Sequence, residues 1–182
     1  DNNTLSKRRF LEMKKGNSYY ILICLLIISV ILSCDRNTEI SSYKQGSWEN
    51  HIVKTNLPDS LNTGSTYLSV YSQIYSNTEH RLHDLTATIS IRNTNKNDTI
   101  FILEANYFNT SGKMIRRYFS QPVFLSPLET IEIVIDQTDQ EGGTGANFIF
   151  DWSIKPGIQE PLFEAVMIST SGQQGLSFTT KG

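Results

Sequence analysis

The sequence predicts an all-β fold, and three observations point to it. From Thr66 onward apolar and polar residues alternate almost throughout, which is the period of a half-buried strand. Turn-forming residues separate these runs at short, regular intervals. After the apolar N-terminal segment, no stretch of about ten residues has a helical period. We therefore predict an antiparallel, Ig-like β-sandwich of about eight strands, with a small barrel as the alternative.

The expected strands are short, and most have one apolar face. In chain order they are TYLSVYSQIY, LTATISIR, IFILEANYF, MIRRYF, TIEIVI, NFIFDWSI, LFEAVMIS and LSFTT. The clearest alternations place these residues toward the core: Leu68, Val70, Ile74, Leu85, Ala87, Ile89, Ile91, Ile131, Ile133, Ile135, Phe148, Phe150, Trp152 and Ile154. The polar runs NTNKND, NTSGK and SGQQG are expected turns, and the segment around His80 is expected to be a polar loop.

An uncharged apolar run at Tyr19–Leu32 predicts export from the cytoplasm. It has fourteen residues, fewer than the roughly 20 that span a bilayer but enough for the core of a secretory signal. Lysines precede it, and Ser33-Cys34 follows it, which resembles the lipobox of bacterial lipoproteins. That resemblance implies cleavage after Ser33 and acylation of Cys34, which would anchor the chain to a bacterial membrane on its periplasmic or surface side. The alternative is an uncleaved N-terminal anchor.

The same signals divide the chain into three parts. Residues 1–33 are the expected upstream extension and signal, with Met13 as the expected start. Residues 34–63 begin with the lipidated cysteine and continue as a polar tether, in which Trp48 and Ile52-Val53 are expected to dock on the domain. Residues 64–182 form the expected β-sandwich domain.

Composition removes several classes of function. Sixteen basic and 18 acidic residues give a net charge of −2, which excludes nucleic-acid binding driven by bulk charge. Cys24 leaves with the signal and Cys34 is acylated, so the exported domain is expected to have no thiol chemistry. Neither Gly-x-Ser-x-Gly nor His-Glu-x-x-His occurs. We expect no catalytic residue and no cofactor.

Six segments from Gly64 to Gly182 together resemble a known family. They are YLSVYSQIY, LTATISIRNTN, YFNTSGKMIRRY, GGTGANFIFDW, PLFEAVMIST and QGLSFTTKG, in this order. The domain resembles a bacterial lipoprotein family catalogued as domain of unknown function 3124, which is often found behind lipoprotein signals. The resemblance implies fold and location and supplies no activity.

Two features are candidate ligand-binding sites. The first is a glycine-rich segment whose exposed amides could hold an anion, with Asn147 directed to the same space; the structural alternative is a wide loop or bulge before the next strand. We expect at least one of its glycines to have positive φ. The second is a pair of charges at strand positions. They either bind a ligand in a pocket, form a partly buried ion pair that fixes the strand register, or are two ordinary outward-facing side chains. The residues concerned are Gly142, Gly143, Gly145 and Asn147, and Arg92 and Glu164.

His80, His83 and Asp84 also lie close together in the sequence, with Glu79 and Arg81 beside them. Imidazoles and carboxylates could ligate zinc. Since no second cluster completes a coordination shell, we favour a solvated polar segment and expect no metal.

Three functions follow as hypotheses, in order of preference. The first is a non-catalytic envelope module that binds a protein or polymer partner through a sheet face or edge strand. The second is a small-ligand or anion binder that uses the glycine-rich segment with Arg92 or Arg81. The third is a hydrolase of envelope glycan or peptide. An exposed apolar patch would favour the first, a pocket at Gly142–Asn147 the second, and converging carboxylates the third.

Overall fold

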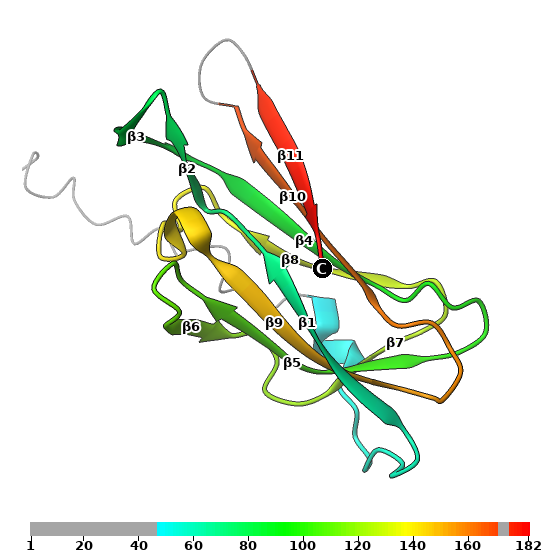
Figure 1. Ribbon diagram of the computed structural model, residues 1–182. Coiled ribbons are helices and arrows are strands. Elements are labelled where there is room, and N and C mark those ends of the chain that lie inside the picture. The colour runs from blue at the N-terminus through cyan, green and yellow to red at the C-terminus, as the bar shows by residue number, and fades with distance from the viewer. Residues whose placement is uncertain (1–46, 171–174) are drawn as a thin grey trace, which may run out of the picture. The chain divides into compact units, whose positions relative to one another are not determined.

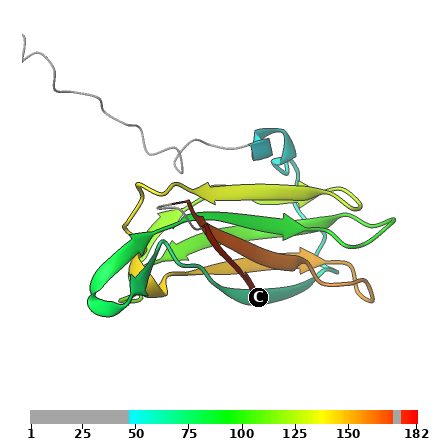
Figure 2. The same ribbon diagram turned by 90° about the horizontal axis from the view of Figure 1, so that it is seen from above.

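A computed structural model describes residues 47–170 and 175–182, which form two facing antiparallel sheets and a separate hairpin (Figures 1 and 2). The strands are β1 (Asn62–Ser69), β2 (Gln73–Ser76), β3 (Thr78–Asp84), β4 (Thr86–Arg92), β5 (Ile100–Phe108), β6 (Met114–Arg117), β7 (Val123–Leu125), β8 (Thr130–Ile135), β9 (Asn147–Ile154), β10 (Leu162–Ser169) and β11 (Leu176–Lys181). The described residues also form two short 3-10 helices, η2 (Ser47–His51) and η3 (Gly143–Gly145).

The strand order confirms the predicted all-β sandwich. The five-stranded sheet has the order β1-β9-β5-β6, with β7 also paired to β5, and the four-stranded sheet has the order β11-β10-β4-β8. The pairs β4–β8 and β5–β9 match central pairs of an immunoglobulin domain, but β1 and β10 take the flanking positions that its last and first strands occupy. The Ig-like assignment therefore stays a prediction.

The core between the sheets follows the predicted alternation. The predicted inward residues of β4, β8 and β9 are all buried. Phe163 of the four-stranded sheet stacks on Phe150 of the five-stranded sheet with ring centroids 4.4 Å apart, and Phe150 stacks on Phe148 at 5.2 Å. This aromatic stack joins the two layers, because its members come from both sheets.

The expectation of one strand over Thr66–Tyr75 and a loop around His80 was wrong. The chain leaves the five-stranded sheet after Ser69, and the amide of Val70 donates to Ala146 O at 2.9 Å. It then forms the hairpin β2–β3, in which His80 lies on a strand. Alternation could not reveal this hairpin because β3 is exposed along most of its length, so neither of its faces is apolar.

The two open sides of the sandwich are closed in different ways. On one side β11 approaches β1, and the Thr180 hydroxyl donates to Ser69 O at 2.6 Å. On the other side η2 contacts both β7 and β8 (Figure 2). Trp48 of η2 is only 5% exposed, and Ile52 forms an isolated antiparallel bridge with Val123. The predicted docking of Trp48 and Ile52-Val53 is confirmed, so part of the expected tether belongs to the fold.

The predicted signal peptide and Cys34 lie outside the described residues. Within 47–170 and 175–182, no helix is long and apolar enough to cross a membrane.

Candidate functional sites

The glycine-rich segment forms the single turn η3 between β8 and β9. Gly143 has φ +73°, which confirms the expectation of a glycine with positive φ. The turn is bound to the end of the β5–β6 hairpin, because Thr110 N donates to Gly142 O at 3.0 Å and Gly145 N donates to Thr110 Oγ1 at 2.9 Å. The Ser72 hydroxyl also donates to Gly143 O, at 3.2 Å. These backbone N–H and C=O groups therefore already form hydrogen bonds within the domain.

Gly142 is required by a close approach rather than by its own φ. A Cβ atom built on it would lie 2.0 Å from the Tyr107 hydroxyl and 2.9 Å from Ser72 Oγ. Tyr107 is fully buried on β5, so its ring has little room to move. The space that a ligand would need next to this glycine is filled by the tyrosine.

A buried arginine on β6 holds the chain just before the glycine-rich segment. Arg116 Nη1 donates to Asp139 Oδ2 at 2.7 Å, and Nη2 donates to Glu141 Oε2 at 2.8 Å. Arg116 is 8% exposed and Asp139 is 1% exposed. The guanidinium also lies 5.9 Å from the ring centroids of both Tyr107 and Tyr118. A buried charge pair with this geometry stabilises the loop only while both partners are present.

The same network shifts three pKa values. Burial raises the pKa of the Tyr118 hydroxyl to about 12, although Arg116 acts in the opposite direction. Burial also raises the pKa of Tyr107 above its ordinary value. Burial alone would lower the pKa of Arg116, but the hydrogen bonds and electrostatic interactions with Asp139 and Tyr118 together outweigh it, so this pKa lies above its ordinary value. The two phenols are therefore neutral and the guanidinium charged over the physiological range.

The sequence analysis missed this network. The one signal available was the pair of adjacent arginines in MIRRYF, because alternation along a strand must turn one of them inward. Which arginine points inward, and that Asp139 meets it, depends on the pairing of β5 with β6 and on the path of the loop after β8.

Arg92 and Glu164 form the ion pair that the structural interpretation predicted. Arg92 Nε lies 3.1 Å from Glu164 Oε2, and the two side chains are 42% and 40% exposed. They are diagonal neighbours on the outer face of the four-stranded sheet, since Arg92 pairs with Leu162 and Glu164 with Ser90. A half-exposed pair of this kind contributes little stability. Its role as a ligand-binding pair stays a prediction.

The structure does not bring the six predicted ligand-binding residues together. The Thr86 end of β4 lies at the glycine-rich end of the sandwich, because the next residue back, Leu85, donates its amide to Ser72 O at 2.9 Å. Arg92 is at the other end of the same strand. Asn147 begins β9 and is half-buried, opposite Ser69 and Phe108. The predicted residues therefore belong to separate regions.

The histidines of the β2–β3 hairpin are also apart from any larger cluster. His80 Nε2 lies 3.6 Å from Glu79 Oε1, and both side chains are at least 80% exposed. Asp84 accepts hydrogen bonds from Gln73 and Gln140 instead. Among residues 47–170 and 175–182, no group of three or more His, Cys, Asp or Glu side chains is placed to hold a metal ion.

The outer face of the four-stranded sheet is the first surface that the sequence analysis did not single out. A row of paired residues crosses four strands of it, from Thr179 through Val166 and Thr88 to Val134. Val166 is 40% exposed and Val134 is 43% exposed, and Ile168 lies next along β10 with 41% exposure. We call Thr88, Val134, Val166, Ile168 and Thr179 the outer patch.

A polar hollow lies on the outer face of the other sheet. Glu104 of β5 and Asp151 of β9 are directly opposite each other at a bulge in the strand pair. With Thr63, Gly64, Ser65 and Leu103 they line an open hollow of about 520 Å³. Arg117 Nη2 lies 3.4 Å from Glu104 Oε2, which also accepts a hydrogen bond from Asn106 at 2.7 Å. Like charges facing each other in a sheet are destabilising, and here an arginine offsets one of them.

Comparison with known proteins gives the family. The family model described as "Protein of unknown function (DUF3124)" matches residues 63–182. The chain belongs to this family. A solved structure described as "Crystal Structure of Thermotoga maritima 1070" is 13% identical and covers 64% of this chain and 90% of that chain, with a TM-score of 0.40. No curated protein matches the chain.

Membership in DUF3124 confirms the domain family predicted from the six segments, with a boundary one residue earlier than expected. The match includes both outer faces, the glycine-rich segment and the β2–β3 hairpin of this DUF3124 domain, and it leaves out η2. The lipoprotein part of the prediction concerns residues before the match and stays a prediction.

Proposed function

We propose that this DUF3124 protein is a non-catalytic module of the bacterial cell envelope, anchored by lipid on Cys34. It binds a protein partner through the outer patch. The observation that carries this proposal is the row Val166–Thr88–Val134, in which β-branched side chains of three paired strands lie side by side, with both valines exposed and Thr88 half-buried. Water-facing positions of a one-sided sheet are ordinarily polar, so aligned valines on the solvent side favour contact with another molecule.

The other residues of this face suit a protein partner. Threonine hydroxyls alternate with the apolar side chains, and the ion pair Arg92–Glu164 lies on the same face. A patch of apolar groups with polar groups at its border is the usual composition of a protein–protein interface.

Crosslinking tests the surface. A photo-reactive amino acid at Val166 should give an adduct in native membranes, whereas the same group at Tyr67, which is 56% exposed on the other sheet, should not. Adducts at Tyr67 alone, or equally at both positions, would contradict the assignment of the face.

A separate experiment tests the anchor. Replacing Cys34 by Ser should move the protein out of the membrane fraction or leave an unprocessed precursor, because acyl chains provide the stable attachment. The anchor is refuted if Cys34→Ser protein is cleaved, labelled with lipid and retained like the native chain.

The polar hollow supports a second candidate, which is binding of a neutral polyhydroxyl group of an envelope polymer. Glu104 and Asp151 can accept hydrogen bonds from hydroxyls, while Arg117 can donate one. Glycoside hydrolysis fits less well. It needs one carboxyl group that delivers a proton, and Glu104 is instead held by an arginine and an amide as an acceptor. Titration with soluble peptidoglycan fragments should shift the amide signals of β5 and β9, and Asp151→Asn should weaken the shift. Shifts confined to the outer patch would refute this candidate.

A further inference from the structure

A short N-terminal segment docks on the open side of the sandwich. We call residues 47–53 the strap. Its main contact is Trp48, whose ring meets Phe119 at 5.1 Å and Tyr118 at 6.3 Å, both edge to face. The cavity left around this tryptophan is only about 10 Å³. Trp48 therefore fills its site as a core residue does.

The strap meets β7 through an isolated bridge rather than a continuous ladder. Ile52 makes one isolated bridge to Val123, and Val53 N donates to Pro122 O at 2.9 Å. An isolated bridge lacks the neighbouring ladder bonds that make a sheet strand cooperative. The strap can therefore open without disturbing β5 or β9, which form the centre of the larger sheet.

A polar contact of His51 joins the strap to the turn before β8. His51 Nε2 lies 2.7 Å from Glu129 Oε1, and Glu129 Oε2 accepts a hydrogen bond from Ser126 N at 2.7 Å. Burial would raise the pKa of Glu129, but the Ser126 amide and His51 outweigh it and lower this pKa below its ordinary value. The carboxylate is therefore ionised at neutral pH and able to accept the bond from the imidazole.

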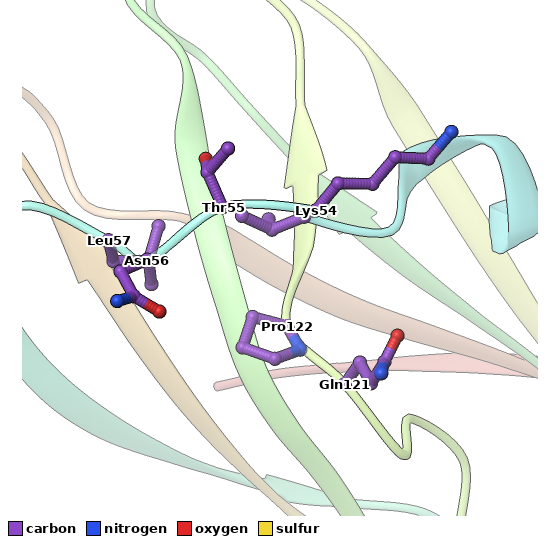
Figure 3. A pocket seen from close by; sticks show the side chains of 7 residues that line it. Lys54, Thr55, Asn56, Leu57, Gln121 and Pro122 are labelled. Carbon is purple, nitrogen blue, oxygen red and sulfur yellow. The ribbon is translucent and has the colours of Figure 1, made fainter.

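Close packing stops immediately after the strap. Lys54, Thr55, Asn56 and Leu57 pass over Gln121 and Pro122 with an open hollow of about 350 Å³ between them (Figure 3). Lys54, Thr55 and Asn56 are exposed. This stretch can act as the hinge when the strap leaves, because no sheet pairing or buried side chain holds its first three residues.

We propose that the strap is a releasable clasp that sets the reach of the domain from the membrane. The inference rests on the proposed anchor at Cys34. Trp48 is 14 positions from Cys34, whereas Asn62, the first residue of β1, is 28 positions away. At about 3.5 Å per extended residue, release raises the maximum reach from about 50 Å to about 100 Å.

Two opposing effects make this clasp reversible. Burial of Trp48 and Ile52 favours the docked strap, while the conformational entropy of residues 47–53 favours release. Among the described residues, the strap is the docked element nearest to Cys34, so a pull between the anchored end and a bound partner acts on it before it acts on the sheets. Load thereby lengthens the tether before it reaches the sheets.

Hydrogen exchange on the full chain tests the docking. Peptides that cover 48–53 should exchange under conditions in which β5 and β9 remain protected. Trp48→Ala should raise strap exchange at least tenfold without changing the sheets, and Lys54→Ala, at an exposed hinge position, is the matched control. If Trp48→Ala does not fold, His51→Ala should give a smaller increase confined to the same peptides. Strap exchange that occurs only together with β5 and β9 would overturn the proposal.

Energy transfer to a lipid-surface acceptor tests the reach. The acylated protein is placed on phospholipid vesicles with a donor dye at Glu160→Cys, an exposed position between β9 and β10. Trp48→Ala should lower the transfer efficiency, and unchanged transfer despite faster strap exchange would overturn the reach. If Cys34→Ser protein binds the vesicles as well as the native chain, the proposed lipid anchor and the proposed change in reach are both refuted. The hydrogen-exchange result still tests whether the docked strap is releasable.

Discussion

The glycine-rich segment and the outer patch differ in how their surroundings are filled. Around the glycine-rich segment, a tyrosine, a threonine and a buried Arg116–Asp139 pair occupy the nearby space. On the outer patch, Val134 and Val166 have about two fifths of their surface exposed. The glycines therefore permit tight internal packing, whereas the valines leave apolar surface for another molecule. An unusual local composition indicates a special backbone, and the three-dimensional surroundings decide whether a ligand can approach it.

Replacing the buried Arg116 should have the largest effect on the stability of the glycine-rich end. Arg116→Met removes the guanidinium that pairs with the buried Asp139, so we expect a loss of about 3–5 kcal/mol in the free energy of unfolding. The control is Arg117→Met, because that side chain is 51% exposed, and it should cost less than about 1 kcal/mol. Denaturant unfolding measures both. Equal small losses would show that the glycine-rich end does not depend on the buried pair.

Adding one methyl group at Gly142 should have the next largest effect. The new Cβ would overlap the Tyr107 hydroxyl, and overpacking a buried site costs about 1–3 kcal/mol. Gly175→Ala is the control, since its nearest neighbour is Ser169 O at 3.9 Å and its change should be within about 0.5 kcal/mol. A neutral Gly142→Ala variant would mean that this site has room for a ligand after all.

Alkaline titration of Tyr118 should show whether water is excluded from the glycine-rich end of the sandwich. Burial raises the pKa of the Tyr118 phenol to about 12, whereas the pKa of an unfolded tyrosine is about 10. The stabilisation from keeping Tyr118 neutral is thus fully present below about pH 10 and is lost as the pH rises through about 12. Tyrosinate absorbance of native protein and of Tyr118→Phe gives the difference curve. A difference curve centred near about pH 10 would show that water reaches this end freely.

A substitution on the outer patch should have the smallest effect on stability. Val166→Lys places a charge on a solvent-facing strand position, so we expect less than about 1 kcal/mol of change in unfolding free energy. Thr179→Ser, at the paired position on β11, is a milder control on the same row. A loss as large as that of Arg116→Met would show that the outer patch is packed against part of its own chain.

Prediction from sequence succeeded where burial is one-sided and failed where it is not. Alternation placed the core residues of β4, β8 and β9 correctly, because each strand has one buried and one solvent face. It missed β3, which is exposed, and it could not find that Glu104 faces Asp151, because that depends on register and on a bulge. Arg116 was missed for the same reason, since its partner lies 23 residues away in a loop.

The most direct test of the central claim compares partner retention for Val166→Lys and Gly145→Ala. Gly145 does not have a positive φ, and a Cβ atom built on it would lie 3.3 Å from Thr110 Cγ2. Alanine there therefore alters the glycine-rich surface without a severe clash. After crosslinking at Ile168 in native membranes, the adduct should be lost with Val166→Lys and kept with Gly145→Ala. An adduct that survives Val166→Lys but disappears with Gly145→Ala would place the binding surface at the glycine-rich segment and contradict the account.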